Sequence, residues 1–370
     1  MQQTNDPFLE IRPFFDEEVP SALKRIINDD EFITAILKYH YPRLTATAYG
    51  LIKPFIKQYL RLKWKKVTTI RDVQFHVAKY MASMIKNTTE GLSASGLSKL
   101  DPHESYLFVS NHRDIAMDPA LVNWCLYQNQ FDTVRIAIGD NLLKRPYATE
   151  LMKLNKSFIV KRSIKAPREL MKALTQLSAY IKMSLDEKQS IWIAQKAGRA
   201  KNGHDKTDPA ILKMFFMEGR RQKLGFSDYV AQLRIVPVTI SYENDPCDVT
   251  KANELYRKEK EGAYEKSEFE DIESIIQGII GQKRRIHVAF GDVIKNGLAT
   301  PELLATEIDR QIYENYYLFP SNYIAAGYEH NSVTDKERKQ FAIKLLALPK
   351  GIADIVRGMY AEPTDKKVDI

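Results

Sequence analysis

One histidine and one aspartate stand where the sequence predicts the change from a strand to a helix. Residues 106–109 (YLFV) are apolar and favour β-structure, so they are predicted to form a buried strand that ends just before His112. Asp118 is followed by Pro119, a pair typical of a helix start, with Asp as the N-cap. In open α/β sheets, ligands bind at this end of the strands. A histidine there with a carboxylate within reach has the composition of a general base and its orienter.

These two side chains suit the abstraction of a proton from an alcohol. An imidazole with an ordinary pKa of about 6.5 is a base at neutral pH, and a carboxylate on its other nitrogen fixes the tautomer. Asp114 and Asp118 both lie close to His112 in sequence, and Asp118 is favoured because a helix start has a fixed position. No serine or cysteine is placed as a covalent nucleophile, so we expect direct attack by the substrate hydroxyl. Backbone N–H groups at the start of the helix are expected to stabilise the developing oxyanion.

Two further predicted strands end in cations. The strand at 157–160 is followed by two cationic residues, and the strand at 190–194 leads into a loop with three cations and a glycine. Cations gathered at neighbouring strand ends could surround one phosphate, to which arginine donates bidentate hydrogen bonds. The alternative for each cation is an ordinary surface ion pair. The residues expected to hold a phosphorylated acceptor are Lys161, Arg162, Lys196, Gly198, Arg199 and Lys201.

Four blocks in this order resemble the glycerolipid acyltransferase superfamily, the glycerol-3-phosphate and 1-acylglycerol-3-phosphate acyltransferases. Segment 111–118 is similar to that family's N-H-x-x-x-x-D motif, and segment 157–162 to its F-I-x-R motif. Segment 196–199 is similar to its glycine-arginine loop, and segment 236–238 to its V-P-V strand. The third block, together with a helical region before the α/β part, looks closest to the soluble plastid glycerol-3-phosphate acyltransferases.

The sequence departs from the family pattern at two places. Five residues separate His112 from Asp118 where the family has four, and an extra residue in such a loop can bulge without moving either end. The loop at 196–199 reads K-A-G-R where the family usually has E-G-T-R, and the plastid branch also lacks that glutamate. Any role of the missing glutamate is therefore not transferred to this chain.

The resemblance implies an O-acyltransferase of phospholipid biosynthesis. It would move a fatty acyl group from acyl-CoA or acyl-carrier protein to a hydroxyl of glycerol-3-phosphate or of a lysophospholipid. His112 would be the general base and Asp118 its orienter, while the cations would hold the acceptor phosphate. Beyond the thioester co-substrate, no cofactor is expected. The remaining histidines are scattered, so no metal site is expected, and no glycine-rich nucleotide-phosphate loop occurs.

The charge balance favours an anionic partner. The chain has 55 Lys and Arg against 47 Asp and Glu, a net charge of +8, which suits a phosphorylated substrate, a membrane surface or nucleic acid. Two cysteines cannot form a disulfide framework, which fits a reducing compartment. We find neither a secretory signal nor an apolar run long enough to span a bilayer. The expected location is therefore cytoplasmic, either free or peripheral on the cytoplasmic face of a membrane.

Residues 38–66 contain eight Lys or Arg and no Asp or Glu, with aromatic residues between them. One interpretation is a surface for anionic lipid headgroups, and the other is a solvated helical face over an aromatic core. An alternative function follows for the whole chain, that of a non-catalytic basic module that docks on anionic membrane or nucleic acid. Such a module would not need the pair of His112 and Asp118. An acyltransferase, in contrast, is not expected to bind nucleic acid.

The fold class follows from an alternation along the chain. Short apolar runs recur with helical patterns between them, which indicates an α/β protein with a mostly parallel, mixed sheet flanked by helices. The apolar runs are 106–110, 134–138, 157–160, 190–194, 235–240 and 286–290, and the clearest helical patterns are 119–127, 167–185 and 269–281.

Three parts of the chain are expected. They are a smaller helical N-terminal domain at 1–90, the α/β acyltransferase domain at 91–320 and a C-terminal helical extension at 321–370. The small-residue stretch 88–98 (TTEGLSASGLS) is predicted to be a linker without a strand. Within the C-terminal part, a helix at 301–318 and one amphipathic segment at 336–360 are predicted, followed by a frayed tail.

Overall fold

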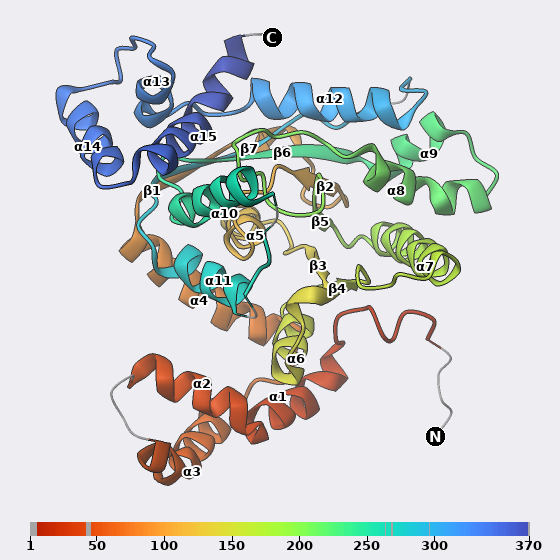
Figure 1. The fold of residues 1–370 in the computed structure, drawn as a ribbon. Coiled ribbons are helices and arrows are strands. Elements are labelled where there is room, and N and C mark those ends of the chain that lie inside the picture. The colour runs from red at the N-terminus through yellow and green to blue at the C-terminus, as the bar shows by residue number, and fades with distance from the viewer. Residues whose placement is uncertain (1–5, 42–45, 263, 268, 296, 369–370) are drawn as a thin grey trace. The chain divides into compact units, whose positions relative to one another are not determined.

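The computed structural model of the 370-residue chain describes residues 6–41, 46–262, 264–267, 269–295 and 297–368 (Figure 1). The chain divides into two compact units. Unit 1 comprises Met1–Tyr80 and Arg135–Leu177, and unit 2 comprises Met81–Val134 and Ser178–Ile370. The boundaries predicted near residues 90 and 320 stay predictions.

Unit 1 begins with helices that enclose two small apolar cores. After the short turn η1 (Asp16–Glu18), apolar residues recur at helical spacing in α1 (Val19–Asn28), whose buried face packs against α3 (Ala46–Lys63). Asp29 caps α2 (Asp30–His40) by accepting the N–H of Phe32 at 2.9 Å. The helices α2 and α3, together with Ile27 of α1, form the second core, made of Ile27, Ile33, Leu37, Tyr49 and Leu60. The helical character predicted for this region is confirmed in its described part.

Unit 1 also holds one pair of strands. β3 (Arg135–Gly139) and β4 (Ser157–Val160) pair in parallel, and both lie at predicted apolar runs. Between them come η3 (Asp140–Leu142) and α6 (Pro146–Leu154), which begins with its proline in the first turn. Two long helices pass from unit 1 into unit 2, α4 (Ile70–Thr88) and α7 (Pro167–Asp186).

Unit 2 is built on five strands in the order β1-β7-β6-β2-β5. They are β1 (Thr89–Ser95), β7 (Arg284–Phe290), β6 (Ile235–Tyr242), β2 (Leu107–Ser110) and β5 (Ile191–Ala194). Only the pair β6–β7 is antiparallel, so the predicted mixed and mostly parallel sheet is confirmed. β2 is buried along its whole length between β5 and β6, which explains its continuous apolar run.

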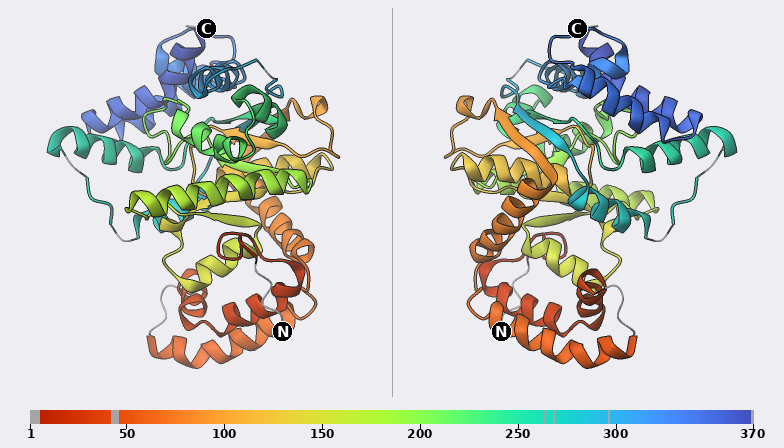
Figure 2. Two further views of the ribbon diagram at one scale, coloured as in Figure 1. Left: turned by 90° about the vertical axis from the view of Figure 1, so that its right-hand side faces the viewer. Right: turned by 90° about the vertical axis from the view of Figure 1, so that its left-hand side faces the viewer.

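Helices cover both faces of this sheet. α12 (Pro301–Glu314) packs on β6 from one side, and α5 (Met117–Gln128) contacts β7 from the other (Figure 1). The helices α13 (Pro320–Ala326), α14 (Asp335–Leu346) and α15 (Lys350–Val368) gather around an apolar core to which Ala252 also contributes (Figure 2). The remaining helical elements are η2 (Leu97–Lys99), α8 (Pro209–Arg221), α9 (Phe226–Leu233), α10 (Asp248–Glu261) and α11 (Glu270–Ile280).

The predicted linker at 88–98 is wrong, because β1 occupies most of it. β1 lies at the edge of the sheet and pairs in parallel with β7. Its side chains are small and mostly exposed, so no alternating or apolar pattern marks it in the sequence. Pairing through the backbone N–H and C=O groups is enough to form such an edge strand.

The C-terminal part shows one predicted feature and needs one further correction. The amphipathic segment predicted at 336–360 forms two helices, α14 and α15, which residues 347–349 separate. The tail is not frayed within the described residues, since α15 continues to Val368. Lys367 explains part of this order, because its Nζ donates to the carbonyl oxygens of Glu314 and Tyr316 at 2.8 and 2.9 Å.

Among the helices of the described ranges, none is both long and apolar enough to cross a bilayer.

Candidate active site

His112 lies just beyond the carboxyl end of β2, the strand that β5 and β6 flank. Its Nδ1 is 2.9 Å from Oδ2 of Asp118, and its side chain is only 13% exposed. An ionised Asp118 accepts the Nδ1 proton, so the lone pair on the imidazole belongs to Nε2. Within the part of the chain that the structure describes, Nε2 makes no hydrogen bond. It is therefore free to accept a proton from a substrate hydroxyl.

The carboxylate of Asp118 is fully buried and accepts hydrogen bonds from four groups. Besides the ring of His112, Oδ2 accepts the N–H of Arg113 at 2.6 Å and that of Asp114 at 2.8 Å. Oδ1 accepts the hydroxyl proton of Tyr242, at 2.8 Å. Burial and the neighbouring carboxylate raise the pKa of Tyr242 well above its usual value, so its hydroxyl remains a donor. These contacts fix which oxygen of Asp118 faces the ring.

The start of α5 differs from the sequence prediction. Asp118 is not the N-cap, because α5 begins one residue earlier, at Met117, after Ala116. The capping contacts come from Asp114, whose Oδ1 accepts the N–H groups of Ala116 and Met117 at 3.0 and 2.9 Å. The longer loop lets Asp114 take the cap and leaves Asp118 for His112, so the carboxylate beside the ring is that of Asp118.

Asp114, like Asp118, is buried, and its surroundings disfavour its charged form. Burial, reinforced by the charge of Asp118, raises the pKa of Asp114 to about 6. In addition, the carboxylates of Asp114 and Asp118 together accept the N–H groups of residues 113, 114, 116 and 117. The oxyanion donors predicted at this helix start are therefore already engaged at those four positions.

A buried ionic network, which the sequence analysis missed, holds the same loop. Arg113 donates from Nη2 to Oδ2 of Asp205 at 2.6 Å, and Asn111 donates from Nδ2 to the same oxygen at 3.0 Å. Lys251 donates from Nζ to the carbonyl oxygen of Arg113 at 2.6 Å and also pairs with Asp245. Like Tyr242, these partners come from segments far along the chain, and no sequence pattern links them to His112.

The glycine-arginine loop adjoins His112 directly. It leaves β5, and the N–H of Ala200 donates to the carbonyl oxygen of His112 at 2.8 Å. Gly198 forms the turn with φ of +83°, a conformation that other residues seldom adopt. Trp192 of β5 places its ring 6.0 Å from that of His112 in an edge-to-face arrangement. Two of the predicted blocks therefore meet in one unit.

The three cations of this loop have different partners. Arg199 donates weakly from Nη2 to Ser274 at 3.4 Å, and its buried Nη1 has no hydrogen-bond partner in the described ranges. Lys196 donates to a backbone carbonyl at 3.2 Å, and burial lowers its pKa. Lys201 forms an ion pair with Glu254. Arg199 is thus the cation with the most unused hydrogen-bonding capacity.

The other two predicted phosphate ligands lie in unit 1, at the end of β4. Lys161 pairs through Nζ with Glu10 at 2.5 Å. The backbone N–H of Arg162 donates to Oδ1 of Asp140 at 3.0 Å. A single phosphate held by cations from both units stays a prediction.

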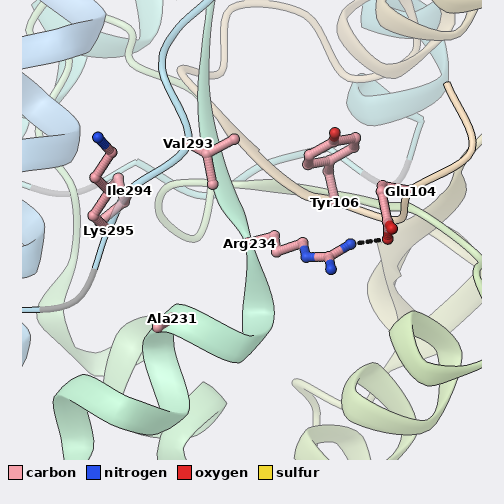
Figure 3. A pocket seen from close by; sticks show the side chains of 7 residues that line it. All are labelled: Glu104, Tyr106, Ala231, Arg234, Val293, Ile294 and Lys295. Atoms are coloured by element: carbon pink, nitrogen blue, oxygen red, sulfur yellow. Dashed lines mark hydrogen bonds and ion pairs between the residues drawn. The ribbon is translucent and has the colours of Figure 1, made fainter. Parts of the chain in front are cut away.

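A separate cavity of about 420 Å³ lies at the amino end of β2 and β6 (Figure 3). Tyr106 and Arg234, the residues that precede these two strands, both line it. Arg234 is paired with Glu104, which also accepts a hydrogen bond from Lys188 at 2.5 Å. Since His112 follows the opposite end of β2, this cavity is not part of the candidate site.

Part of this chain is similar to known acyltransferases. A family model described as Acyltransferase matches residues 91–242, a segment that runs from within β1 to the end of β6. A search of curated protein sequences gives no match. Among solved structures, one match is the 1-acyl-sn-glycerophosphate (LPA) acyltransferase PlsC from Thermotoga maritima, with 12% identity and a TM-score of 0.39 over 80% of this chain and 94% of that one. Residues 91–242 of this chain therefore match an acyltransferase family, in agreement with the resemblance to glycerolipid acyltransferases that the four sequence blocks indicated.

Proposed function

We propose that this chain transfers a fatty acyl group from an acyl-CoA or acyl-carrier-protein thioester to a hydroxyl of glycerol-3-phosphate or of a lysophospholipid. The observation that carries the proposal is the pair of His112 and Asp118 inside the acyltransferase domain. The ring is held at 2.9 Å from a buried carboxylate and leaves Nε2 available.

The proposed reaction begins with removal of the proton from the acceptor hydroxyl. Nε2 of His112 takes this proton while the oxygen attacks the thioester carbonyl carbon, and the buried Asp118 stabilises the resulting imidazolium. The tetrahedral intermediate then collapses, the C–S bond breaks, and the imidazolium returns the proton to the leaving thiolate. An ester and a free thiol are formed, so atoms and charge balance without a covalent enzyme intermediate.

The oxyanion of the intermediate needs hydrogen-bond donors. The N–H groups of residues 113, 114, 116 and 117 donate to Asp114 and Asp118. Within the described residues, the N–H of Ile115 has no such partner. In this proposal it is the donor that the loop offers to the thioester oxygen.

The acceptor phosphate is assigned first to Arg199. Its buried Nη1 lacks a partner among the described residues, and an unsatisfied guanidinium N–H favours binding of an anion. Lys196 adds a second cation from the same loop, whereas the charge of Lys201 is already matched by Glu254. Lys161 and Arg162 remain proposed ligands from unit 1.

The test is a matrix of acyl donors and acceptors with the purified full chain. Release of thiol from acyl-CoA and from acyl-carrier protein is followed with glycerol-3-phosphate, 1-acylglycerol-3-phosphate and a neutral lysolipid, and the ester product is identified by mass spectrometry. We expect acceptor-dependent thiol release that requires a phosphorylated acceptor. Absence of release with every pair, or equal rates with the neutral lysolipid, would overturn the proposal.

A further inference from the structure

Helix α3 in unit 1 carries apolar residues on two neighbouring faces, one buried and one exposed. Its inner face packs into the core that it shares with α2, through Tyr49, Ile52, Ile56 and Leu60. Its outer face carries Leu51, Phe55, Tyr59 and Leu62, which follow at i, i+4, i+8 and i+11 and so lie along one line of the helix. We call these four residues the α3 stripe.

The α3 stripe is strongly exposed. Leu51, Phe55 and Leu62 are 71%, 75% and 65% exposed. A helix at the surface of a globular protein normally has a polar outer face, and contiguous apolar patches mark surfaces that bind something. A helix with apolar residues on both faces therefore needs a second apolar environment.

Cations flank the α3 stripe, whereas its centre carries none. Lys63 lies over the ring of Tyr59 at 5.5 Å, and Lys65 and Lys66 follow the helix. From residue 38 to residue 66 the sequence has no Asp or Glu, although Arg43 lies outside the described residues. An apolar line with cations and aromatic rings at its margins is the pattern of a helix that lies in the interface of an anionic bilayer.

A small cavity of about 340 Å³ lies beside the end of α3. Its apolar lining includes Leu23 and Trp64, and three cations surround it, Lys24 from α1 with Arg61 and Lys65. No carboxylate pairs with any of the three among the residues that the structure describes; Arg61 donates only to the side-chain oxygen of Asn28. We call it the α1–α3 pocket, and its charge and size suit a lipid phosphate.

We propose that this part of unit 1 docks on an anionic lipid bilayer. The α3 stripe inserts among the acyl chains, and the α1–α3 pocket receives the phosphate of a lipid headgroup. A surface that binds an acidic protein, such as an acyl-carrier protein, would carry cations at its centre. The centre of the α3 stripe is apolar instead. The proposal rests on the geometry of unit 1 and not on acyl transfer.

The experiment measures binding of the full chain to vesicles by co-sedimentation. Vesicles of phosphatidylcholine alone are compared with vesicles of equal parts phosphatidylcholine and phosphatidylglycerol, at low and high salt. We expect preferential binding to the anionic vesicles that weakens as salt rises, because exposed charges are screened. Equal binding to both vesicle types, or no binding to either, would overturn the proposal.

Two sets of substitutions separate the two parts of the surface. Leu51→Ser with Phe55→Ser and Leu62→Ser should weaken binding to the anionic vesicles by about tenfold or more, through loss of apolar burial. In the α1–α3 pocket, Lys24→Gln with Arg61→Gln and Lys65→Gln should remove about fivefold in affinity per charge on anionic vesicles only. Wild-type binding by the serine variant would overturn the proposal.

Matched controls come from α14 and from the first residue of α15. Leu346 is 84% exposed, and Leu346→Ser should leave vesicle binding unchanged. The charge control replaces three exposed lysines, Lys336, Lys339 and Lys350, by Gln, and should also bind as the wild type does. Loss of binding in either control would show a non-specific charge or solubility effect and would overturn the assignment.

A gain of signal guards against misfolded variants. In Phe55→Trp, tryptophan emission should shift to the blue on addition of anionic vesicles, relative to the wild type. A His112→Ala variant should still bind vesicles, which distinguishes failure of docking from failure of the proposed catalysis. If the α3 stripe instead joins two copies of the chain, or if acyl-carrier protein displaces the chain from vesicles, sedimentation and competition will reveal it and the proposal fails.

Discussion

The loop that carries His112 and the outer face of α3 differ in which side chains they bury. The loop buries polar groups, whereas α3 exposes apolar ones. Around His112, carboxylates, an amide, an arginine and a lysine are buried and joined to one another within one unit. On α3, large apolar side chains face outwards and several cations lack acidic partners in the described residues. A catalytic base needs one fixed geometry. A surface proposed to bind lipid needs exposed apolar side chains for the acyl chains and cations for the headgroups. The comparison predicts sharp effects of substitution at the loop and graded effects on α3.

The largest effect is expected from His112→Ala. Removal of the base should lower kcat by about 10³-fold while the fold is retained. Thiol release from acyl-CoA measures the loss. The matched control is His204→Ala, which removes a histidine that also contacts a carboxylate, Glu362, at 2.6 Å. An equal loss of kcat in both variants would contradict the assignment of His112 as the base.

Arg199→Ala should come second. Loss of a charge-assisted contact to the acceptor phosphate should raise the acceptor KM by about tenfold to hundredfold, with little change in the KM for the thioester. Lys201→Ala is the control, because Lys201 already pairs with Glu254, and its acceptor KM should change by less than about threefold. Steady-state kinetics with varied acceptor gives both values. A larger effect at Lys201 would reverse the assignment of the phosphate ligand.

Tyr242→Phe tests whether the loop is fixed through its carboxylate. The variant removes the hydroxyl that donates to Oδ1 of Asp118, and kcat should fall by about tenfold with unchanged KM. Tyr229→Phe, at another fully buried tyrosine of unit 2, should keep wild-type kcat. A normal kcat in Tyr242→Phe would mean that the backbone N–H groups alone hold Asp118.

The last prediction concerns the stability of the fold and its dependence on pH, not turnover. The pKa of Asp114 is raised to about 6, so between roughly pH 4 and 6 the folded chain binds a proton that the unfolded chain has lost. Stability contributed at this site should therefore fall as pH rises through that window, by up to about 3 kcal/mol. Urea unfolding of the wild type and Asp114→Asn, compared across this range, should show a weaker decline in the variant. Parallel pH profiles would contradict the raised pKa.

Patterns of neighbouring residues in the sequence predicted most of the strands and the pair at the candidate site. The apolar runs predicted the strands β2 to β7, and the residues around 112 and 118 indicated a base and a carboxylate that do lie in contact. The same patterns failed at β1, whose small exposed side chains leave no periodicity, and at the cap of α5, which Asp114 takes. Asp205, Tyr242 and Lys251 could not be found from sequence, because only the folded chain brings them to the loop.

The backbone hydrogen bond from Ala200 to His112 has a consequence for engineering selectivity. The segment that presents Arg199 is anchored to the main chain of the residue that supplies the base. Grafting residues 196–201 from a relative in order to change acceptor preference would therefore also shift the position of the imidazole. A grafted loop that keeps the Gly198 turn and the backbone N–H at position 200 preserves that position. Acceptor selectivity is therefore best changed by side-chain substitutions alone.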